Sequence, residues 1–195
     1  MLDIAGQALT KTVKFYDNAA VVKNGTQSAL HMDGSRDFFD LGRVTAIEKS
    51  QKTAFSVDFT RENADSGTEK LVWNHLKLGL SIVGDGLRVS AATANQGFKA
   101  FDVQNLGLTD TNLHRAIVMV DSASDHLQVI LDDRVVLDVT NVDFQVPGGG
   151  GREAGWTLGN AWNEFYQGDV SDFRVGDRFE FLDDTYVPPA QSAFG

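Results

Sequence analysis

The sequence predicts an all-β fold, a sandwich of two antiparallel sheets, from the spacing of its apolar residues and from the turns between them. Phe55, Val57 and Phe59 alternate with small or polar residues, and this period of two places them on one face of a strand. The same alternation recurs at 76–82, 127–131, 135–139 and 173–181. Turn-forming residues separate these runs, namely Asp33-Gly34, Gly84-Asp85-Gly86, Asn95-Gln96-Gly97 and Asp132-Asp133. Many short strands at regular spacing are typical of a sandwich or barrel.

One domain is expected to use the whole chain. A length of 195 residues suits a single sandwich, and 42% hydrophobic with 23% charged residues can bury a sizeable core. Residues 116–120 are apolar on both faces, which predicts a central strand covered on both sides, with a short buried helix as the alternative. Trp73 and Trp156 are predicted to lie in the core.

Charge and composition exclude several classes of function. The net charge is −10, and residues 99–195 carry 6 basic and 16 acidic side chains, a balance that excludes binding to nucleic acid or to anionic membranes. The absence of cysteine excludes disulfides, thiolate zinc sites and a cysteine nucleophile. No segment approaches the roughly 20 apolar residues of a membrane span, and residues 1–17 lack a signal-peptide core. We expect no membrane insertion, and a location outside the cell or on the surface of a particle.

Four stretches, in order, resemble a known family. Residues 29–41 resemble its opening hairpin, and residues 113–121, with His114, resemble its Trp-His-x-x-Val-Thr-x-Asp strand. Residues 127–138 resemble its next strand pair, and residues 156–175 resemble its closing Leu-Gly and Phe-x-Gly-x-Ile-x-Asp-x-Arg pattern. The family is the laminin G-like and pentraxin-like branch of the concanavalin A-like lectin/glucanase superfamily. Leu113 stands where the family has Trp, and the turn at Asp132-Asp133 lacks the family's Gly.

The resemblance implies a concanavalin A-like jelly-roll sandwich for residues 28–182. Residues 1–27 are then expected to form an N-terminal arm or a first edge strand, and residues 183–195 an extended C-terminal tail. The glucanase signature of this superfamily, Glu-x-Asp-x-x-Glu, is absent from the sequence. A Gly-x-Ser-x-Gly elbow is absent as well. We therefore expect no catalytic residues and no enzymatic activity.

The histidines give no metal signal in the sequence. His31, His75, His114 and His126 are dispersed, without the spacing of a site built from several histidines. His114 is predicted to be a structural side chain at the start of a strand.

The best candidate for a binding site is the segment 160–166, a predicted loop that holds two aromatic residues among amide and acidic groups. Aromatic faces stack on sugar rings, while amides and carboxylates bond to hydroxyls. The predicted ligand-binding residues of this segment are Asn160, Trp162, Asn163, Glu164 and Tyr166, and the resemblance to pentraxins implies Asn74 as a further one. By partial similarity to the calcium loop of pentraxins, Asn163 and Glu164 are also expected to be Ca²⁺ ligands, although Ala161 and Trp162 stand where further ligands would be. In the alternative interpretation, Trp162 and Tyr166 pack against the sandwich edge or another subunit.

The sequence thus favours a non-catalytic binding module that recognises a glycan or a cell-surface partner, with Ca²⁺ as the one expected cofactor. The alternative is a structural or assembly protein: a phage virion decoration, spike or fibre component, or an adhesin domain. That alternative predicts a homo-oligomer or a larger assembly.

Overall fold

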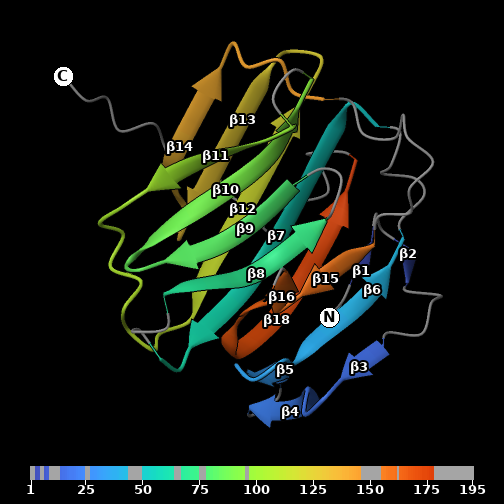
Figure 1. Ribbon diagram of the computed structural model, residues 1–195, viewed down its shortest axis with the longest axis vertical. Coiled ribbons are helices and arrows are strands. Elements are labelled where there is room, and N and C mark those ends of the chain that lie inside the picture. Colours follow the sequence, from blue (N-terminus) through green and yellow to red (C-terminus); the bar gives the residue numbers. More distant parts are fainter. Residues whose placement is uncertain are drawn as a thin grey trace.

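The computed structural model describes residues 3–4, 7–8, 14–24, 27–43, 50–63, 67–74, 78–94, 97–145, 155–161 and 163–177. Within these ranges the chain forms two large β-sheets that pack face to face, and no helix (Figure 1). The predicted all-β, two-sheet sandwich is confirmed. No helix of the described residues is long and apolar enough to cross a membrane. The predicted tail, residues 183–195, lies outside the described ranges.

The first sheet has nine strands, in the order β14-β13-β12-β7-β18-β1-β2, with β5 also pairing with β18 and β4 pairing with β5. Its pairs are antiparallel except for the short parallel pair of β1 with β18. The strands are β1 (Asp3–Ile4), β2 (Gln7–Ala8), β4 (Ala20–Asn24), β5 (Gln27–Asp33), β7 (Lys52–Arg61), β12 (His114–Asp121), β13 (His126–Leu131), β14 (Arg134–Thr140) and β18 (Gln167–Gly176).

The second sheet has seven strands, in the order β11-β10-β9-β8-β15-β6-β3. These strands are β3 (Lys14–Tyr16), β6 (Phe38–Gly42), β8 (Thr68–Asn74), β9 (Leu78–Val83), β10 (Gly86–Thr93), β11 (Gly97–Val103) and β15 (Trp156–Leu158). A separate hairpin consists of β16 (Asn160–Ala161) and β17 (Glu164–Phe165). Segments of the predicted N-terminal arm pair with both sheets, and β3 is an edge strand.

The core lies between the two sheets, where the period-two residues meet. Phe55, Val57 and Phe59 are fully buried, as their alternation predicts. Trp156 of the seven-stranded sheet packs edge-on against Phe55 of the nine-stranded sheet, with 5.8 Å between ring centroids. Burial of each such side chain contributes about 1.5–3 kcal/mol to the hydrophobic stabilisation.

The run 116–120 is part of strand β12, which lies between β7 and β13 as a central strand. Ala116 and Val118 face the main core. Ile117 is also buried, in a small cluster on the outer face with Ala54 and Ile130. The helical alternative for this run is wrong.

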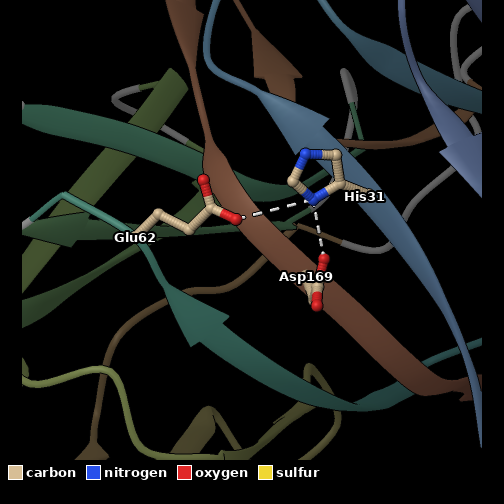
Figure 2. Close-up of side chains that lie close together, drawn as sticks. All are labelled: His31, Glu62 and Asp169. Carbon is tan, nitrogen blue, oxygen red and sulfur yellow. Dashed lines mark hydrogen bonds and ion pairs between the residues drawn. The ribbon is translucent and has the colours of Figure 1, made fainter. Parts of the chain in front are cut away.

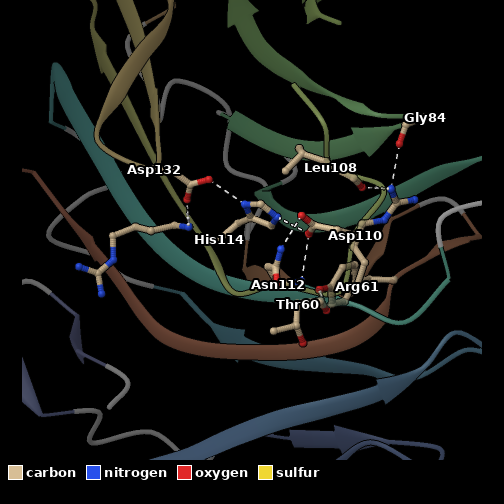
Figure 3. A network of polar contacts seen from close by, with 10 residues as sticks. Thr60, Arg61, Gly84, Leu108, Asp110, Asn112, His114 and Asp132 are labelled. Atoms are coloured by element: carbon tan, nitrogen blue, oxygen red, sulfur yellow. Dashed lines mark hydrogen bonds and ion pairs between the residues drawn. The ribbon is translucent and has the colours of Figure 1, made fainter. Parts of the chain in front are cut away.

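A buried ion pair inside the sandwich links strand β7 of the nine-stranded sheet to strand β8 of the seven-stranded sheet. Arg61 of β7 and Glu69 of β8 are almost fully buried, with Nε 3.0 Å from the Glu69 carboxylate. The Arg61 guanidinium also donates to the backbone carbonyls of Gly84 and Leu108 (Figure 3). Leu108 in turn donates its amide to the Asp85 carbonyl. One buried side chain thus fixes both the turn between β9 and β10 and the segment that follows β11.

His114, the first residue of β12, contacts the end of the segment that follows β11. Its ring lies between two carboxylates, with Nδ1 2.7 Å from Asp132 and Nε2 2.9 Å from Asp110 (Figure 3). Burial lowers the pKa of His114, but the hydrogen bonds to Asp132 and Asp110 outweigh it, so the pKa is raised above its ordinary value of 6.5. His114 begins strand β12, as predicted.

We predict that Arg61→Leu lowers the free energy of unfolding by about 3–5 kcal/mol, because it leaves the buried Glu69 carboxylate without its cation. The double variant Arg61→Leu/Glu69→Leu removes both charges and is expected to recover a large part of that loss. Chemical denaturation of the three proteins measures both effects. Equal stability of the single and double variants would contradict this account of the pair.

We predict that His114 makes stability depend on pH. Because its folded-state pKa is raised, its contribution is complete below about pH 6.5 and is lost as the pH rises through the folded-state value. The difference in melting temperature between the wild type and His114→Gln should therefore be largest near pH 6 and narrow toward higher pH. A difference that stays constant with pH would refute this role, and His126→Gln serves as the control at a more exposed histidine.

Candidate functional site

A row of polar side chains crosses the outer face of the seven-stranded sheet. Lys70 of β8 is the direct neighbour of Ser81 in β9, which neighbours Arg88 in β10, which neighbours Asp102 in β11. Leu87 and Val89, on either side of Arg88, are buried in the core. Alternation along the strand therefore points Arg88 and its row away from the core.

A bulge in β8 brings Lys70 and Trp73 to this outer face. The pairing of β8 with β9 shifts between Lys70 and Val72, so one extra residue is inserted into β8. Leu71 and Val72 are consecutive, yet both are fully buried in the core. Lys70 and Trp73, which flank them, consequently share the outer face, and the Lys70 ammonium lies 5.2 Å from the centroid of the indole ring.

Arg88 and Asp102 form the most exposed part of the row. Two parallel hydrogen bonds of 2.7 Å join the guanidinium to the two carboxylate oxygens. The bond from Arg88 lowers the pKa of Asp102, and the bond to Asp102 raises the pKa of Arg88. Both side chains remain more than a third exposed. Their charged ends are therefore fixed in position and open to solvent.

The β16–β17 hairpin extends the row beyond Lys70. Gly159 has a φ of +91°, and a Cβ at this position would lie 2.0 Å from the Met32 sulfur, so only glycine fits the turn that leads into the hairpin. The amide of Tyr166 donates to the Gly159 carbonyl and closes the hairpin at its base. Glu164 then lies 2.9 Å from the Lys70 ammonium. We call Glu164, Lys70, Ser81, Arg88 and Asp102 the charged row.

Trp73 and Phe98 form an aromatic pair beside the charged row. Their rings stack with 5.2 Å between centroids. The indole lies directly over Gly79, where a Cβ would be 2.0 Å from a ring carbon. Trp73 is buried, as predicted, but on the outer face rather than between the sheets.

The charged row offers both donors and acceptors to a polar ligand. Arg88 supplies N–H groups, and the carboxylates of Asp102 and Glu164 supply acceptors. Between the two cations, the Ser81 hydroxyl is buried and has no hydrogen-bond partner among the described residues. Together with the partly exposed ring of Phe98, these groups suit a hydroxyl-rich ligand at a surface.

The structure brings three of the predicted ligand-binding residues together in the hairpin. Asn160 and Glu164 lie in its two strands, and Asn163 is exposed in the turn between them. The Asn160 side-chain oxygen is buried without a hydrogen-bond partner among the described residues. Trp162 lies outside the described residues.

Tyr166 and Asn74 are placed differently from what the sequence suggested. Tyr166 is fully buried in the core, and its hydroxyl donates to the Thr60 carbonyl. Burial raises the pKa of Tyr166 well above its ordinary value. Asn74 ends β8 and is also buried. Neither residue has exposed side-chain surface for a ligand.

Lys70, Arg88 and Asp102 were not among the residues predicted from the sequence. Arg88 alternates with Leu87 and Val89, so an outward position could have been inferred for it. Its pairing with Asp102 depends on the register of the hairpin formed by β10 and β11. The outward position of Lys70 could not be predicted without the bulge, because strict alternation would have placed it on the same face as Val72.

No protein-family model and no curated protein matches the chain. Solved structures do match. The CBM40 domain of the Ruminococcus gnavus IT-sialidase, bound to α2,3-sialyllactose, has a TM-score of 0.66 at 9% identity, over 82% of this chain and 96% of that one. The receptor-binding domain of botulinum neurotoxin mosaic serotype C/D has a TM-score of 0.64 at 10% identity, over 84% of this chain and 42% of that one.

The binding domain of botulinum neurotoxin DC, in complex with rat synaptotagmin II, has a TM-score of 0.64 at 5% identity, over 86% of this chain and 43% of that one. These likenesses show the fold alone. The chain spans less than half the length of the toxin domains. The three structures named here are binding domains, and their likeness agrees with the predicted β-sandwich without showing which superfamily the chain belongs to.

We predict that Gly79→Ala displaces the Trp73 ring, because the new methyl group would overlap it. The expected results are a changed near-ultraviolet circular dichroism spectrum and a loss of about 1–3 kcal/mol in stability. Gly155→Ala is the matched control, since the nearest atom to its Cβ would be 3.4 Å away. An unchanged spectrum for Gly79→Ala would show that the indole does not pack on Gly79.

Proposed function

We propose that the protein is a non-catalytic module that binds a glycan on the outer face of its seven-stranded sheet, at the charged row beside the β16–β17 hairpin. The observation that carries the proposal is the charged row itself. It holds Arg88 and Asp102 in one exposed pair and Glu164 beside Lys70, and Glu164 is near enough to help raise the pKa of Arg88. Sugar hydroxyls pair with both donors and acceptors, and this surface offers both.

The state of the carboxylates supports binding rather than hydrolysis. A glycosidase needs one carboxylic acid that stays protonated near neutral pH, which requires a raised pKa. Arg88 instead lowers the pKa of Asp102, and Glu164 is paired with Lys70. The Asp102 carboxylate is therefore suited to accept hydrogen bonds and not to deliver a proton.

The matched structures support the same class of function. One is a sialidase domain with sialyllactose bound, and another is a toxin domain bound to synaptotagmin II. A glycan is favoured over a protein partner here because the exposed groups of the charged row are polar and narrowly grouped, with the aromatic pair beside them. The alternative of assembly on a particle stays a prediction.

We predict that Arg88→Gln weakens glycan binding by about tenfold to a hundredfold, the effect of losing a charged hydrogen bond of about 1.5–3 kcal/mol. Binding is measured by calorimetry with a panel that includes α2,3-sialyllactose, α2,6-sialyllactose and neutral oligosaccharides. Arg115→Gln is the matched control, because Arg115 makes the same bidentate ion pair, with Asp58 on the other sheet. It should bind as the wild type does.

The proposal fails if no glycan of a broad panel binds, or if Arg115→Gln weakens binding as much as Arg88→Gln. The same titrations, repeated with Ca²⁺ and with a chelator, test the calcium prediction for Asn163 and Glu164. Asn163 is exposed and has oxygen to offer, but Glu164 already has a cation partner in Lys70. Ca²⁺ assistance predicts that Asn163→Ala abolishes any effect of the chelator.

A further inference from the structure

A second cluster of polar side chains lies on the outer face of the nine-stranded sheet. His31 of β5 and Asp169 of β18 are direct neighbours across the strand pair, and Glu62 follows the end of β7 (Figure 2). Met32 and Val170, the next residues along their strands, are buried in the core. His31 and Asp169 therefore point to the outer face of the nine-stranded sheet.

Two carboxylates of this cluster approach one and the same ring nitrogen. His31 Nδ1 lies 2.8 Å from the Asp169 carboxylate and 3.6 Å from that of Glu62. The amide of Glu62 donates to the Gln167 carbonyl, which holds Glu62 beside β18. A single N–H at Nδ1 has one hydrogen to donate, so it cannot serve both carboxylates equally.

His114 shows the arrangement that a purely structural histidine adopts. It also has two carboxylate partners, but each contacts a different ring nitrogen, Asp132 at Nδ1 and Asp110 at Nε2. A protonated ring satisfies both of them. At His31 the two carboxylates converge with Nδ1 on one point, and the three ligand atoms lie within 4.8 Å of one another.

We propose that His31, Glu62 and Asp169 bind a divalent transition-metal ion, with Zn²⁺ as the best fit. One imidazole nitrogen and two carboxylate oxygens are a donor set that Zn²⁺ accepts. Ligand atoms about 2.0–2.2 Å from a tetrahedral ion lie roughly 3.3–3.6 Å apart. The two carboxylates lie 2.8 and 3.6 Å from His31 Nδ1, near that spacing, and all three ligand atoms lie within 4.8 Å of one another.

Three protein ligands leave one coordination position of the ion open, and a cavity lies farther along the same two strands. A cavity of about 200 Å³ begins where β5 and β18 separate, and its lining is mostly apolar. Ala29 and Ser171 line it, and each lies two residues from a proposed ligand, on the same face of its strand. The open position would be available to water, because the three ligands are partly exposed.

The three side chains are reachable from solvent, with exposed fractions of 27–46%. They lie on the opposite sheet from the charged row. The metal site is thus independent of the proposed glycan site, and either can fail without the other.

The test is a calorimetric titration of the full chain with Zn²⁺, after a chelator has removed any bound metal. It is run at about pH 8, where protons compete little with Zn²⁺ for the histidine. We expect one high-affinity Zn²⁺ per chain and a higher melting temperature with Zn²⁺. Both should be lost in His31→Ala, and the affinity should fall at least tenfold in Asp169→Asn and Glu62→Gln. His126→Gln, which removes a histidine paired with the carboxylate of Asp138, is the matched control and should leave binding unchanged.

The proposal is overturned if the wild type shows no Zn²⁺ binding, if binding survives in His31→Ala, or if His126→Gln weakens it equally. Stronger binding of Ca²⁺ than of Zn²⁺ would also overturn it, because an imidazole ligand disfavours Ca²⁺. Should His31→Ala fail to fold, Asp169→Asn decides the question, with circular dichroism confirming its fold.

Discussion

The extra residue in β8 determines what each side of the seven-stranded sheet presents. Because Leu71 and Val72 both enter the core, the residues before them are shifted to the opposite face from the one strict alternation would give. Glu69 turns inward, where it meets Arg61, while Lys70 turns outward, where it meets Glu164. A regular strand would expose Glu69 and bury Lys70, and both ion pairs would be lost.

The inward and outward ion pairs act on the same region of the fold. Arg61 fixes the turn between β9 and β10 and the segment after β11 by its bonds to backbone carbonyls. These two connections border the strands that carry Arg88 and Asp102. A buried ion pair costs desolvation energy and adds little net stability. The role of this pair is therefore to hold these two connections in one arrangement. A rigid surface loses less conformational entropy when it binds a ligand.

Much of the fold could be predicted from the sequence because burial between two sheets leaves a period of two. The alternation at Phe55 to Phe59 and at Leu127 to Leu131 marks inward positions correctly. The prediction loses accuracy wherever that period is interrupted. The bulge at Leu71 reverses the faces of its neighbours, and the turn at Gly159 sends Tyr166 into the core. Neither event has a signature that alternation alone can reveal.

The candidate sites were harder to predict because their partners meet through sheet pairing. His31 and Asp169 are 138 residues apart and become neighbours only when β5 pairs with β18. Glu164 reaches Lys70 only because the hairpin lies against β8. The segment 160–166 was identified from its mixture of residue types, whereas the strand residues that complete the surface depend on register.

The central claim is that ligands bind on the outer face of the seven-stranded sheet. Nuclear magnetic resonance of a panel glycan titrated into the protein tests it most directly, by following the side-chain N–H signals of Arg88, Arg115 and Trp73. The account predicts shifts at Arg88 and Trp73 with Arg115 unchanged. Shifts at Arg115 alone would place the ligand on the nine-stranded sheet and contradict it.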